Sequence, residues 1–224
     1  MSSSWPTCGL ARNRTVHTRD RRTGPREMRM SNPPRWLRTG AVRNQVSGST
    51  LLFVCTGNIC RSAFAAAALR ARVGDRADTC VASAGIRAMQ GWPMDPGMAR
   101  AGAELGLALG GHEARQVTGR MIANTAAVVV FGPEHRAWMR QEFPEHMGRV
   151  VAIGQVARGL GTLPRSGRLP LAHVVEAVTS DAPRIVDADW IDDPYGHDDS
   201  VKMICAKRIL TDVDILATRV DWED

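Results

Sequence analysis

Residues 51–62 read LLFVCTGNICRS, and the interpretation of the whole chain starts from this stretch. An apolar run, 51–54, ends at Cys55, and a tight loop then leads to Arg61 and an alanine-rich helical pattern. Parallel strands that are covered on both faces read as such unbroken apolar runs. A cysteine at the end of a buried strand, followed by a tight loop and an arginine at a helix start, is typical of a thiolate site that handles phosphate.

The loop between Cys55 and Arg61 has the residues that an anion-binding turn requires. Gly57 permits unusual backbone angles, and Asn58 is the next most tolerant residue of left-handed geometry. The N–H groups of such a turn point inward, next to a helix N-terminus with its partial positive charge. Arg61 supplies a planar fork that matches two phosphate oxygens. Ser62 is a good N-cap type for the helix, and its hydroxyl can also donate to the Cys55 sulfur.

These features predict a reactive thiol at Cys55. They stabilise negative charge at the sulfur, and the pKa of thiols so placed falls from about 8.5 to roughly 3.5–7.5. Three other interpretations stay open: half of a zinc site with Cys60, a nucleotide-binding P-loop, and an inert buried thiol. No second Cys or His pair with ligand spacing follows, and the GxxxxGK[ST] pattern is absent. The Gly-Asn and Arg-Ser neighbours disfavour the inert thiol.

A leaving alkoxide or phenolate needs a proton, so we expect a carboxylic acid near the loop. The best candidate region is 190–196, which reads WIDDPYG. Asp193, directly before a proline that stiffens the turn, is the first choice, and Asp192 is the second. We expect Asp198 and Asp199 to cap the last helix instead. The alternative for the whole segment is a solvated acidic turn.

The composition indicates one globular domain preceded by a basic extension. The chain has 224 residues, 44% of them hydrophobic, and no apolar stretch near the roughly 20 residues that cross a bilayer. Five cysteines are too few for a disulfide framework, which favours a reducing cytosol and thus a cytoplasmic protein. The net charge of +6 comes from residues 1–48, where ten Arg face two acidic residues. The remaining residues are nearly balanced in charge.

Residues 1–48 contain Pro-Pro, scattered Gly and Ser and no apolar period, so we expect them to be disordered. They lack the apolar core of a secretory signal. One interpretation is an unstructured extension, or a start codon placed too early with Met28 or Met30 as the true start. The other is an anion-binding arm for nucleic acid or membrane. The folded domain is expected at 49–224.

Strand and helix signals alternate along that domain. Strands are expected at 50–54, 80–84, 126–131 and 149–153, and helices at 62–73, about 95–107, 134–142 and about 199–219. Residues 157–185 look partly like loop, with a short helix around 170–178. The alternation predicts an α/β sheet of right-handed βαβ units. Open α/β sheets bind ligands beyond the carboxyl ends of their strands, which is where Cys55 lies.

The chain resembles the low-molecular-weight protein tyrosine phosphatases, and in particular a bacterial branch of that family. The similarity spans about 50–217, with its motifs in the family's order. The segments that carry it are 54–62 (VCTGNICRS, against the family's VCxGNICRS), 83–85 (SAG), Gly91 with 93–96 (PMDP), 134–136 (EHR) and 193–195 (DPY).

The resemblance implies a four-stranded parallel sheet flanked by helices on both faces, with the phosphate-binding loop after the first strand. It implies a phosphocysteine intermediate and neither metal nor cofactor. Cys55 would be the nucleophile, Arg61 would bind the phosphoryl oxygens, and Asp193 would protonate the leaving oxygen and then activate water. Cys60 resembles a second loop cysteine that pairs with the nucleophile under oxidation. The other residues expected to bind phosphate or substrate are Thr56, Gly57, Asn58, Ile59, Cys60, Ser62 and Tyr195.

Several positions depart from the family pattern. The aromatic position after SAG is Met89, with Trp92 three residues on, and Ile86 replaces the usual Thr. An acidic residue common at the start of the third strand aligns with Ala126. These changes leave the nucleophile, the arginine and the acid intact, so they bear on substrate choice and rate.

We therefore expect a phosphotyrosine phosphatase that acts on phosphotyrosine-containing protein or small aryl phosphates, with no nucleic acid bound by the domain. The alternatives are a thiol-dependent arsenate reductase on the same fold, or a non-catalytic module that binds phosphate or phosphoprotein. Arsenate reduction needs two further cysteines, and Cys80 and Cys205 fall in a predicted strand and helix, away from loops beside the site. The intact Cys55, Arg61 and Asp193 disfavour the module. The sequence does not predict the oligomeric state.

Overall fold

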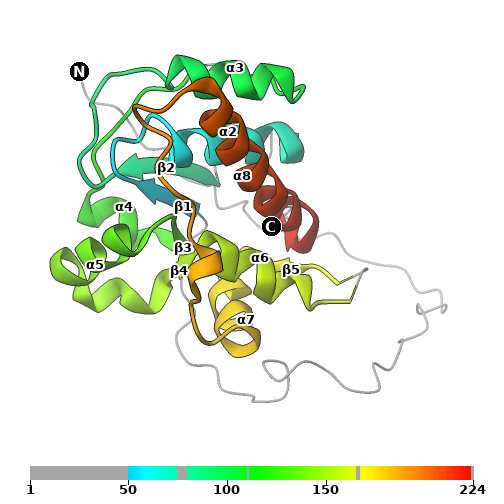
Figure 1. The fold of residues 1–224 in the computed structure, drawn as a ribbon. Coiled ribbons are helices and arrows are strands. Elements are labelled where there is room, and N and C mark those ends of the chain that lie inside the picture. The colour runs from blue at the N-terminus through cyan, green and yellow to red at the C-terminus, as the bar shows by residue number, and fades with distance from the viewer. Residues whose placement is uncertain (1–49, 75–79, 110, 165–166, 223–224) are drawn as a thin grey trace, which may run out of the picture.

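The computed structural model of the protein describes residues 50–74, 80–109, 111–164 and 167–222 (Figure 1). The basic extension expected at 1–48 lies outside these residues. Its disorder and the domain boundary at 49 therefore stay predictions.

Four parallel strands form the central sheet, in the order β2–β1–β3–β4. The strands are β1 (Thr50–Cys55), β2 (Val81–Gly85), β3 (Thr125–Val130) and β4 (Val150–Ala152). Every residue of these strands is buried, as the unbroken apolar runs predicted. The expected four-stranded parallel sheet is thus confirmed, and each strand agrees with its predicted range to within one or two residues.

Helices connect the strands and cover both faces of the sheet. They are α2 (Arg61–Val73), α3 (Pro96–Glu104), α4 (Gly119–Ala123), α5 (Pro133–Glu142), α6 (Ile153–Gly161), α7 (Val174–Asp181) and α8 (Asp199–Arg219). Short 3₁₀ turns lie at Pro144–Arg149, Leu171–His173 and Asp187–Asp189, and a small parallel pair is formed by β5 (Leu169–Pro170) and β6 (Val220–Asp221).

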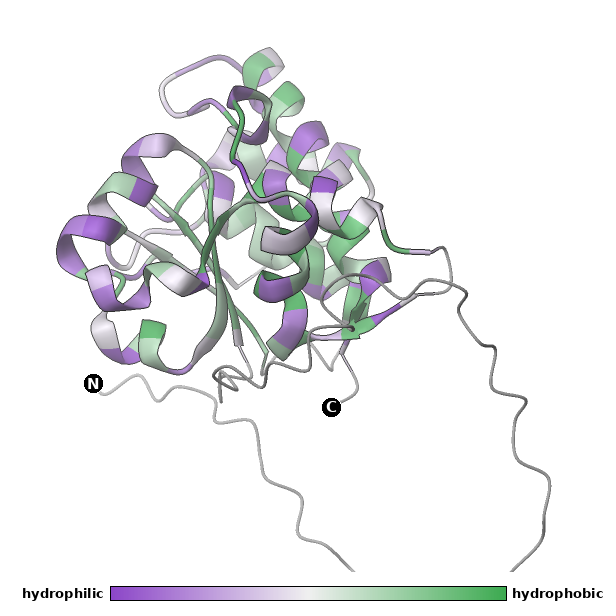
Figure 2. Ribbon diagram, turned by 90° about the horizontal axis from the view of Figure 1, so that it is seen from below, coloured by the Kyte–Doolittle hydropathy of each residue, from purple (hydrophilic) through white to green (hydrophobic). Residues whose placement is uncertain are grey.

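Alternation along β1 divides the core into two clusters. Leu51 and Phe53 face one side, where they pack with apolar residues of α2, α3, α6, α7 and α8. Leu52 and Val54 face the other side, toward α4 and α5. This is the period of two that a strand imposes on its side chains. Figure 2 shows hydrophobic colour along the central strands and hydrophilic colour on the outer turns of the helices.

The segment 157–185 is more helical than the sequence predicted. Helix α6 occupies its first part, and α7 extends beyond the expected 170–178. Gly159 lies inside α6, where a Cβ would be 2.9 Å from Val178 Cα of α7. The glycine marks a close approach of two helices rather than a turn, and the same helix shortens the strand expected at 149–153.

The strand order also places the site. In an open sheet of order 2-1-3-4, the chain leaves β1 and β3 in opposite directions, and ligands bind in the crevice between them. Cys55 is the last residue of β1. The connection from β3 to α5, residues 131–132, lies on the other side of that crevice.

Two glycines of α6 allow a test of the close contact between α6 and α7. Gly159→Ala is expected to lower the free energy of unfolding by about 1–3 kcal/mol, because backbone atoms of α7 must move. Gly161→Ala is the matched control, since a Cβ there meets nothing within 4 Å, and it should be neutral or stabilising by about 0.5–1 kcal/mol. Urea denaturation measures both, and equal effects would contradict the proposed packing.

Candidate active site

The loop of residues 56–60 curls between β1 and α2, with its one left-handed residue at Asn58 (φ 55°). The prediction that this stretch needs such a residue is confirmed. The prediction for Gly57 is wrong, because its φ is not positive. The strained angle falls on the residue whose side chain can form compensating hydrogen bonds.

Asn58 is completely buried and is held at three points. Its backbone carbonyl accepts a hydrogen bond of 2.6 Å from His112 Nε2, and its Oδ1 accepts one of 2.9 Å from the Arg115 backbone N–H. Its Nδ2 donates to Ser62 Oγ at 2.9 Å. Burial lowers the pKa of His112 from its ordinary value. The ring is therefore neutral and carries its proton on Nε2, because a carbonyl can only accept.

Ser62 connects this anchor to the nucleophile. Its Oγ lies 2.9 Å from Cys55 Sγ and 3.3 Å from the carbonyl of Ala84. Because Asn58 donates to Ser62, the hydroxyl hydrogen is left for the sulfur or for that carbonyl, and a thiolate attracts it more strongly. The expected Ser62–Cys55 contact is confirmed. The N-cap prediction is wrong, because α2 begins at Arg61 with Cys60 as its N-cap.

The end of β2 and the residues that follow it support the loop from one side. The carbonyl of Thr56 accepts from Arg87 N at 3.0 Å, and that of Gly57 accepts from Met89 N at 3.0 Å. A Cβ on Gly85 would lie 2.5 Å from the Thr56 carbonyl oxygen. The glycine of the SAG segment is therefore required by the close approach of the loop. The departure at Met89 places a flexible side chain beside Gly57.

The Arg61 guanidinium lies below the loop and is only 2% exposed. Its Nη2 is 2.6 Å from Asp193 Oδ2, and its Nη1 donates to the carbonyl of Ile191 at 3.1 Å. Glu134 Oε1 lies 3.7 Å from Nη1. The buried Nε has no hydrogen-bond partner among the described residues. One donor of a buried cation, on the residue that ends the Cys55 loop, thus remains available for an acceptor.

Asp193 reaches Arg61 from a turn far along the chain. The backbone N–H of Tyr195 donates to Asp193 Oδ1 at 3.1 Å, an Asx-type turn that leaves Oδ2 for the guanidinium. Of the two acids considered, Asp193 and not Asp192 forms the ion pair with Arg61. Asp198 caps α8 by accepting from Val201 N at 3.1 Å, as expected. Asp199 does not cap but pairs with Arg100.

His135 is a site residue that sequence reasoning missed. It is fully buried, and its Nε2 lies 3.0 Å from Thr56 Oγ1 and 3.1 Å from Glu134 Oε1. Burial, with the Arg61 charge as a second cause, lowers its pKa to about 3. The neutral ring therefore ties the first turn of α5 to the residue after Cys55. The EHR segment at 134–136 is the only sequence signal for this residue, and it does not predict what His135 contacts.

The other thiols near the loop are unlike a nucleophile. Burial, then the charges of Asp95, Cys55, Asp193 and Cys205, raise the pKa of Cys60 far above its ordinary value. Burial raises the pKa of Cys205 to about 12. Cys205 lies in α8, as expected, but the charges of the site reach it, so it is nearer to the loop than its place in a helix suggested.

Two kinds of feature are absent from the described part of the chain. In residues 50–74, 80–109, 111–164 and 167–222, no three His, Cys, Asp or Glu side chains are grouped so as to hold a metal ion. Over the same ranges, no helix is both long and apolar enough to span a bilayer.

A family model described as low molecular weight phosphotyrosine protein phosphatase matches residues 50–162. The chain belongs to this family. A probable low molecular weight protein-tyrosine-phosphatase EpsP from Ralstonia solanacearum is 35% identical over 107 residues, which are 48% of this chain and 72% of that protein. The phosphatase Etp from Escherichia coli K12 is 34% identical over 111 residues, 50% of this chain and 73% of that protein.

Solved structures show the same fold. The tyrosine phosphatase Wzb from Escherichia coli K30, in complex with sulphate, superposes with a TM-score of 0.58 at 21% identity, over 76% of this chain and 96% of that one. The YwlE arginine phosphatase from Geobacillus stearothermophilus has a TM-score of 0.57 at 25% identity, over 75% of this chain and 90% of that one.

The matched range includes the loop of Cys55 but ends before Asp193. The case for the acid therefore depends on geometry. A residue 132 positions beyond Arg61 in the chain lies 2.6 Å from its guanidinium, at the mouth of the same loop.

The buried His135 predicts a specific dependence of stability on pH. Its pKa is about 3 in the folded state and 6.5 in an ordinary environment, so the unfolded chain takes up a proton first as pH falls. Stability is therefore lost from about pH 6.5 downward. Between pH 7 and pH 5 this group alone costs about 2 kcal/mol. Urea denaturation of wild type and His135→Asn at both pH values should show that difference. Equal pH dependence in the two proteins would contradict a buried neutral histidine.

Proposed function

We propose that the protein is a phosphotyrosine phosphatase that hydrolyses aryl phosphate monoesters through a phosphocysteine intermediate. The observation that carries the proposal is the buried Arg61 guanidinium at the end of the Cys55 loop, with an Nε that has no partner among the described residues. Backbone amides of residues 56–60 and this cation together suit a phosphate group. Family membership supports the same activity.

In the first step, the sulfur of Cys55 attacks phosphorus, so that an S–P bond forms and the P–O bond to the phenol breaks. Asp193 gives its proton to the leaving oxygen. Its side chain is 46% exposed, so a substrate can reach it from solvent. Arg61 and the loop amides stabilise the charge on the phosphoryl oxygens, which is the largest catalytic effect such a site provides.

In the second step, the Asp193 carboxylate takes a proton from water while the water oxygen attacks phosphocysteine. The S–P bond breaks, phosphate leaves and the Cys55 thiolate returns. Ser62 donates to this thiolate, which makes it a better leaving group.

The ion pair between Arg61 and Asp193 has a consequence for the order of events. An incoming phosphate dianion competes for the same guanidinium, and it brings more charge than one carboxylate. When phosphate binds, it therefore replaces Asp193 as the ion-pair partner of Arg61 and frees Asp193 Oδ2. The hydrogen bond from Tyr195 N to Oδ1 keeps the acid in place.

Two exposed aromatic residues are proposed to form the walls of the substrate site. Tyr195 lies two residues after the acid, and its side chain is 55% exposed. The side chain of Trp92 is 57% exposed, and its backbone N–H donates to Met89, whose own N–H donates to Gly57 of the loop. An aromatic leaving group gains from such surfaces. We propose phosphotyrosine in a protein, or a small aryl phosphate, as substrate, and the cytoplasm as its place.

Cys60 is proposed as a redox partner of Cys55. A peroxide oxidises the Cys55 thiolate to a sulfenic acid, and the Cys60 thiol then attacks that sulfur. A disulfide forms and water leaves, which protects the nucleophile from irreversible oxidation. Both cysteines are buried and unpaired in this structure.

Arsenate reduction on the same fold is the less favoured function. A relay of thiols needs thiolates near neutral pH. Of the two further cysteines that such a relay would need, Cys80 is buried beside β2, and burial raises the pKa of Cys205 to about 12. Phosphoarginine is a further substrate to test, because one solved structure with this fold is an arginine phosphatase.

Release of phosphate from a series of aryl phosphates tests the proposal. Cys55→Ser should abolish turnover, and Asp193→Asn should lower kcat by about 10²–10⁴-fold. Asp192→Asn is the matched control, because that carboxylate does not pair with Arg61, and it should retain most of the activity.

Three results would contradict the proposal. A wild type that binds phosphate but hydrolyses no aryl phosphate would indicate a non-catalytic module. Arsenate turnover with a thiol, without aryl phosphate hydrolysis, would indicate a reductase. A strong preference for phosphoarginine would remove phosphotyrosine as the substrate class.

A further inference from the structure

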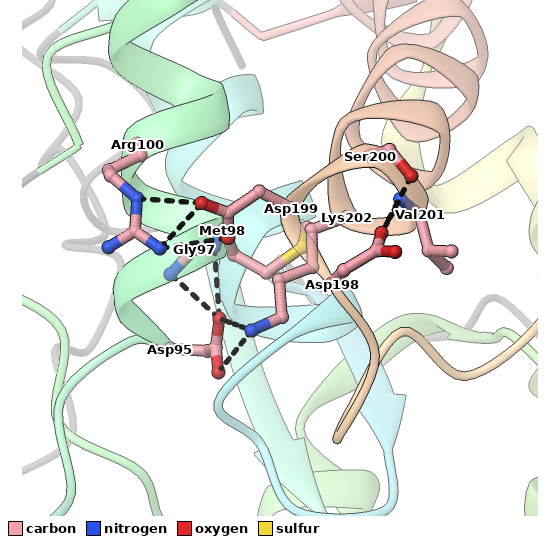
Figure 3. A network of polar contacts seen from close by, with 9 residues as sticks. All are labelled: Asp95, Gly97, Met98, Arg100, Asp198, Asp199, Ser200, Val201 and Lys202. Atoms are coloured by element: carbon pink, nitrogen blue, oxygen red, sulfur yellow. Dashed lines mark hydrogen bonds and ion pairs between the residues drawn. The ribbon is translucent and has the colours of Figure 1, made fainter.

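An ion pair joins the N-cap of α3 to the first turn of α8 (Figure 3). Asp95 caps α3 by accepting hydrogen bonds from Gly97 N at 2.9 Å and Met98 N at 3.0 Å. The Lys202 ammonium lies 3.1 Å from Asp95 Oδ1 and 3.3 Å from its Oδ2. The two side chains are only 13% and 11% exposed.

The position of Lys202 is not explained by α8 alone. It lies in the first turn of that helix, where the positive end of the helix dipole disfavours a cation. It is also largely removed from water, which costs free energy unless the charge is paired. Gly97 makes room for it, because a Cβ there would lie 2.9 Å from the Lys202 Nζ. The side chain is therefore held in this place by Asp95.

Asp95 is joined to the phosphate loop. Its backbone N–H donates to the carbonyl of Ile59 at 2.8 Å, inside the segment between Cys55 and Arg61. The carboxylate is close enough to Cys60 that its charge is the second cause, after burial, of the raised pKa of that thiol.

Lys202 is joined to the segment that carries the acid. Its backbone N–H donates to the carbonyl of Asp198 at 3.2 Å, and Asp198 caps α8. Residues 193–198 run from the acid straight into this cap. The Asp95–Lys202 contact thus links the back of the phosphate loop with the C-terminal end of the acid turn.

We propose that Lys202 is a positioning residue that, through Asp95, sets the distance between the Cys55 loop and Asp193. The inference rests on the proposed phosphatase function. It assigns Lys202 no contact with substrate. The pair holds the start of α8, and thereby the acid turn, at a fixed place relative to the phosphate loop.

The proposed role has a signature that simple loss of stability lacks. Proton transfer from Asp193 matters most when the leaving phenolate is basic, and least when it is a good leaving group. A displaced acid should therefore slow aryl phosphates of basic phenols, while those of acidic phenols keep most of their rate. A misplacement of about 1 Å can cost roughly 10²-fold.

The experiment measures kcat for aryl phosphates of graded leaving-group basicity in wild type and four variants. Lys202→Met removes the cation, and Asp95→Asn removes the charge while keeping a good N-cap for α3. Arg100→Met is the matched control, since it removes an exposed ion pair to Asp199 that joins the same two helices. The double variant of Asp95 and Lys202 completes a mutant cycle.

We expect Lys202→Met and Asp95→Asn to lower kcat about 10-fold or more for basic phenols and much less for acidic ones. The double variant should be no worse than the single variants, and Arg100→Met should match wild type. If kcat of either single variant depended on leaving-group basicity as it does in wild type, the proposal would be overturned. An Arg100→Met variant with the same loss of kcat as Lys202→Met would also overturn it.

Failure of the proposed function is distinguished in the same assay. A wild type without aryl phosphatase activity overturns both inferences. An active wild type, an inactive Cys55→Ser and a Lys202→Met variant that behaves like wild type overturn the positioning role alone. If Lys202→Met does not fold, Asp95→Asn decides the question, because it retains the capping hydrogen bonds.

Discussion

The position of the Cys55 sulfur depends on one strained residue, Asn58. Its left-handed backbone turns the loop inward, and its buried amide satisfies hydrogen bonds on both sides of that turn. A residue other than glycine in this conformation costs free energy, so the conformation persists only where its surroundings fix it. Here the surroundings are His112, Arg115 and Ser62. The last of these reaches the nucleophile, so loop shape and sulfur environment are set by the same side chain.

The sheet order brings the remaining parts to this loop from distant segments. The first turn of α5 supplies His135, and the turn before α8 supplies Asp193. Arg61 is the point where they meet, since it contacts the acid turn directly and lies near Glu134. Rigid strands carry the nucleophile, whereas the acid is carried by a turn whose position depends on helix contacts. That difference explains why an ion pair between α3 and α8 can bear on catalysis.

Local features of the site could be predicted from the sequence, because neighbouring residues encode them. The strand, the loop and the helix that holds Arg61 occupy one continuous stretch, and Asp193 could be named because a proline turn follows it. The contacts of His135 and Lys202 could not, since each joins residues far apart in the chain. The predictions for Gly57 and for the segment 157–185, which contains Gly159, are wrong for a related reason. A glycine signals either backbone freedom or close packing, and only the neighbours in space decide between them.

The central claim is that phosphorus passes through the sulfur of Cys55. The most direct test is rapid acid quenching of the wild-type protein during turnover of an aryl phosphate, followed by peptide mass spectrometry, with Cys55→Ala as the control. The account predicts phosphate bound to the Cys55 peptide of the wild type and to no peptide of the variant. Phosphate release at the wild-type rate without phosphorus on that sulfur, or with phosphorus on another residue, would contradict it.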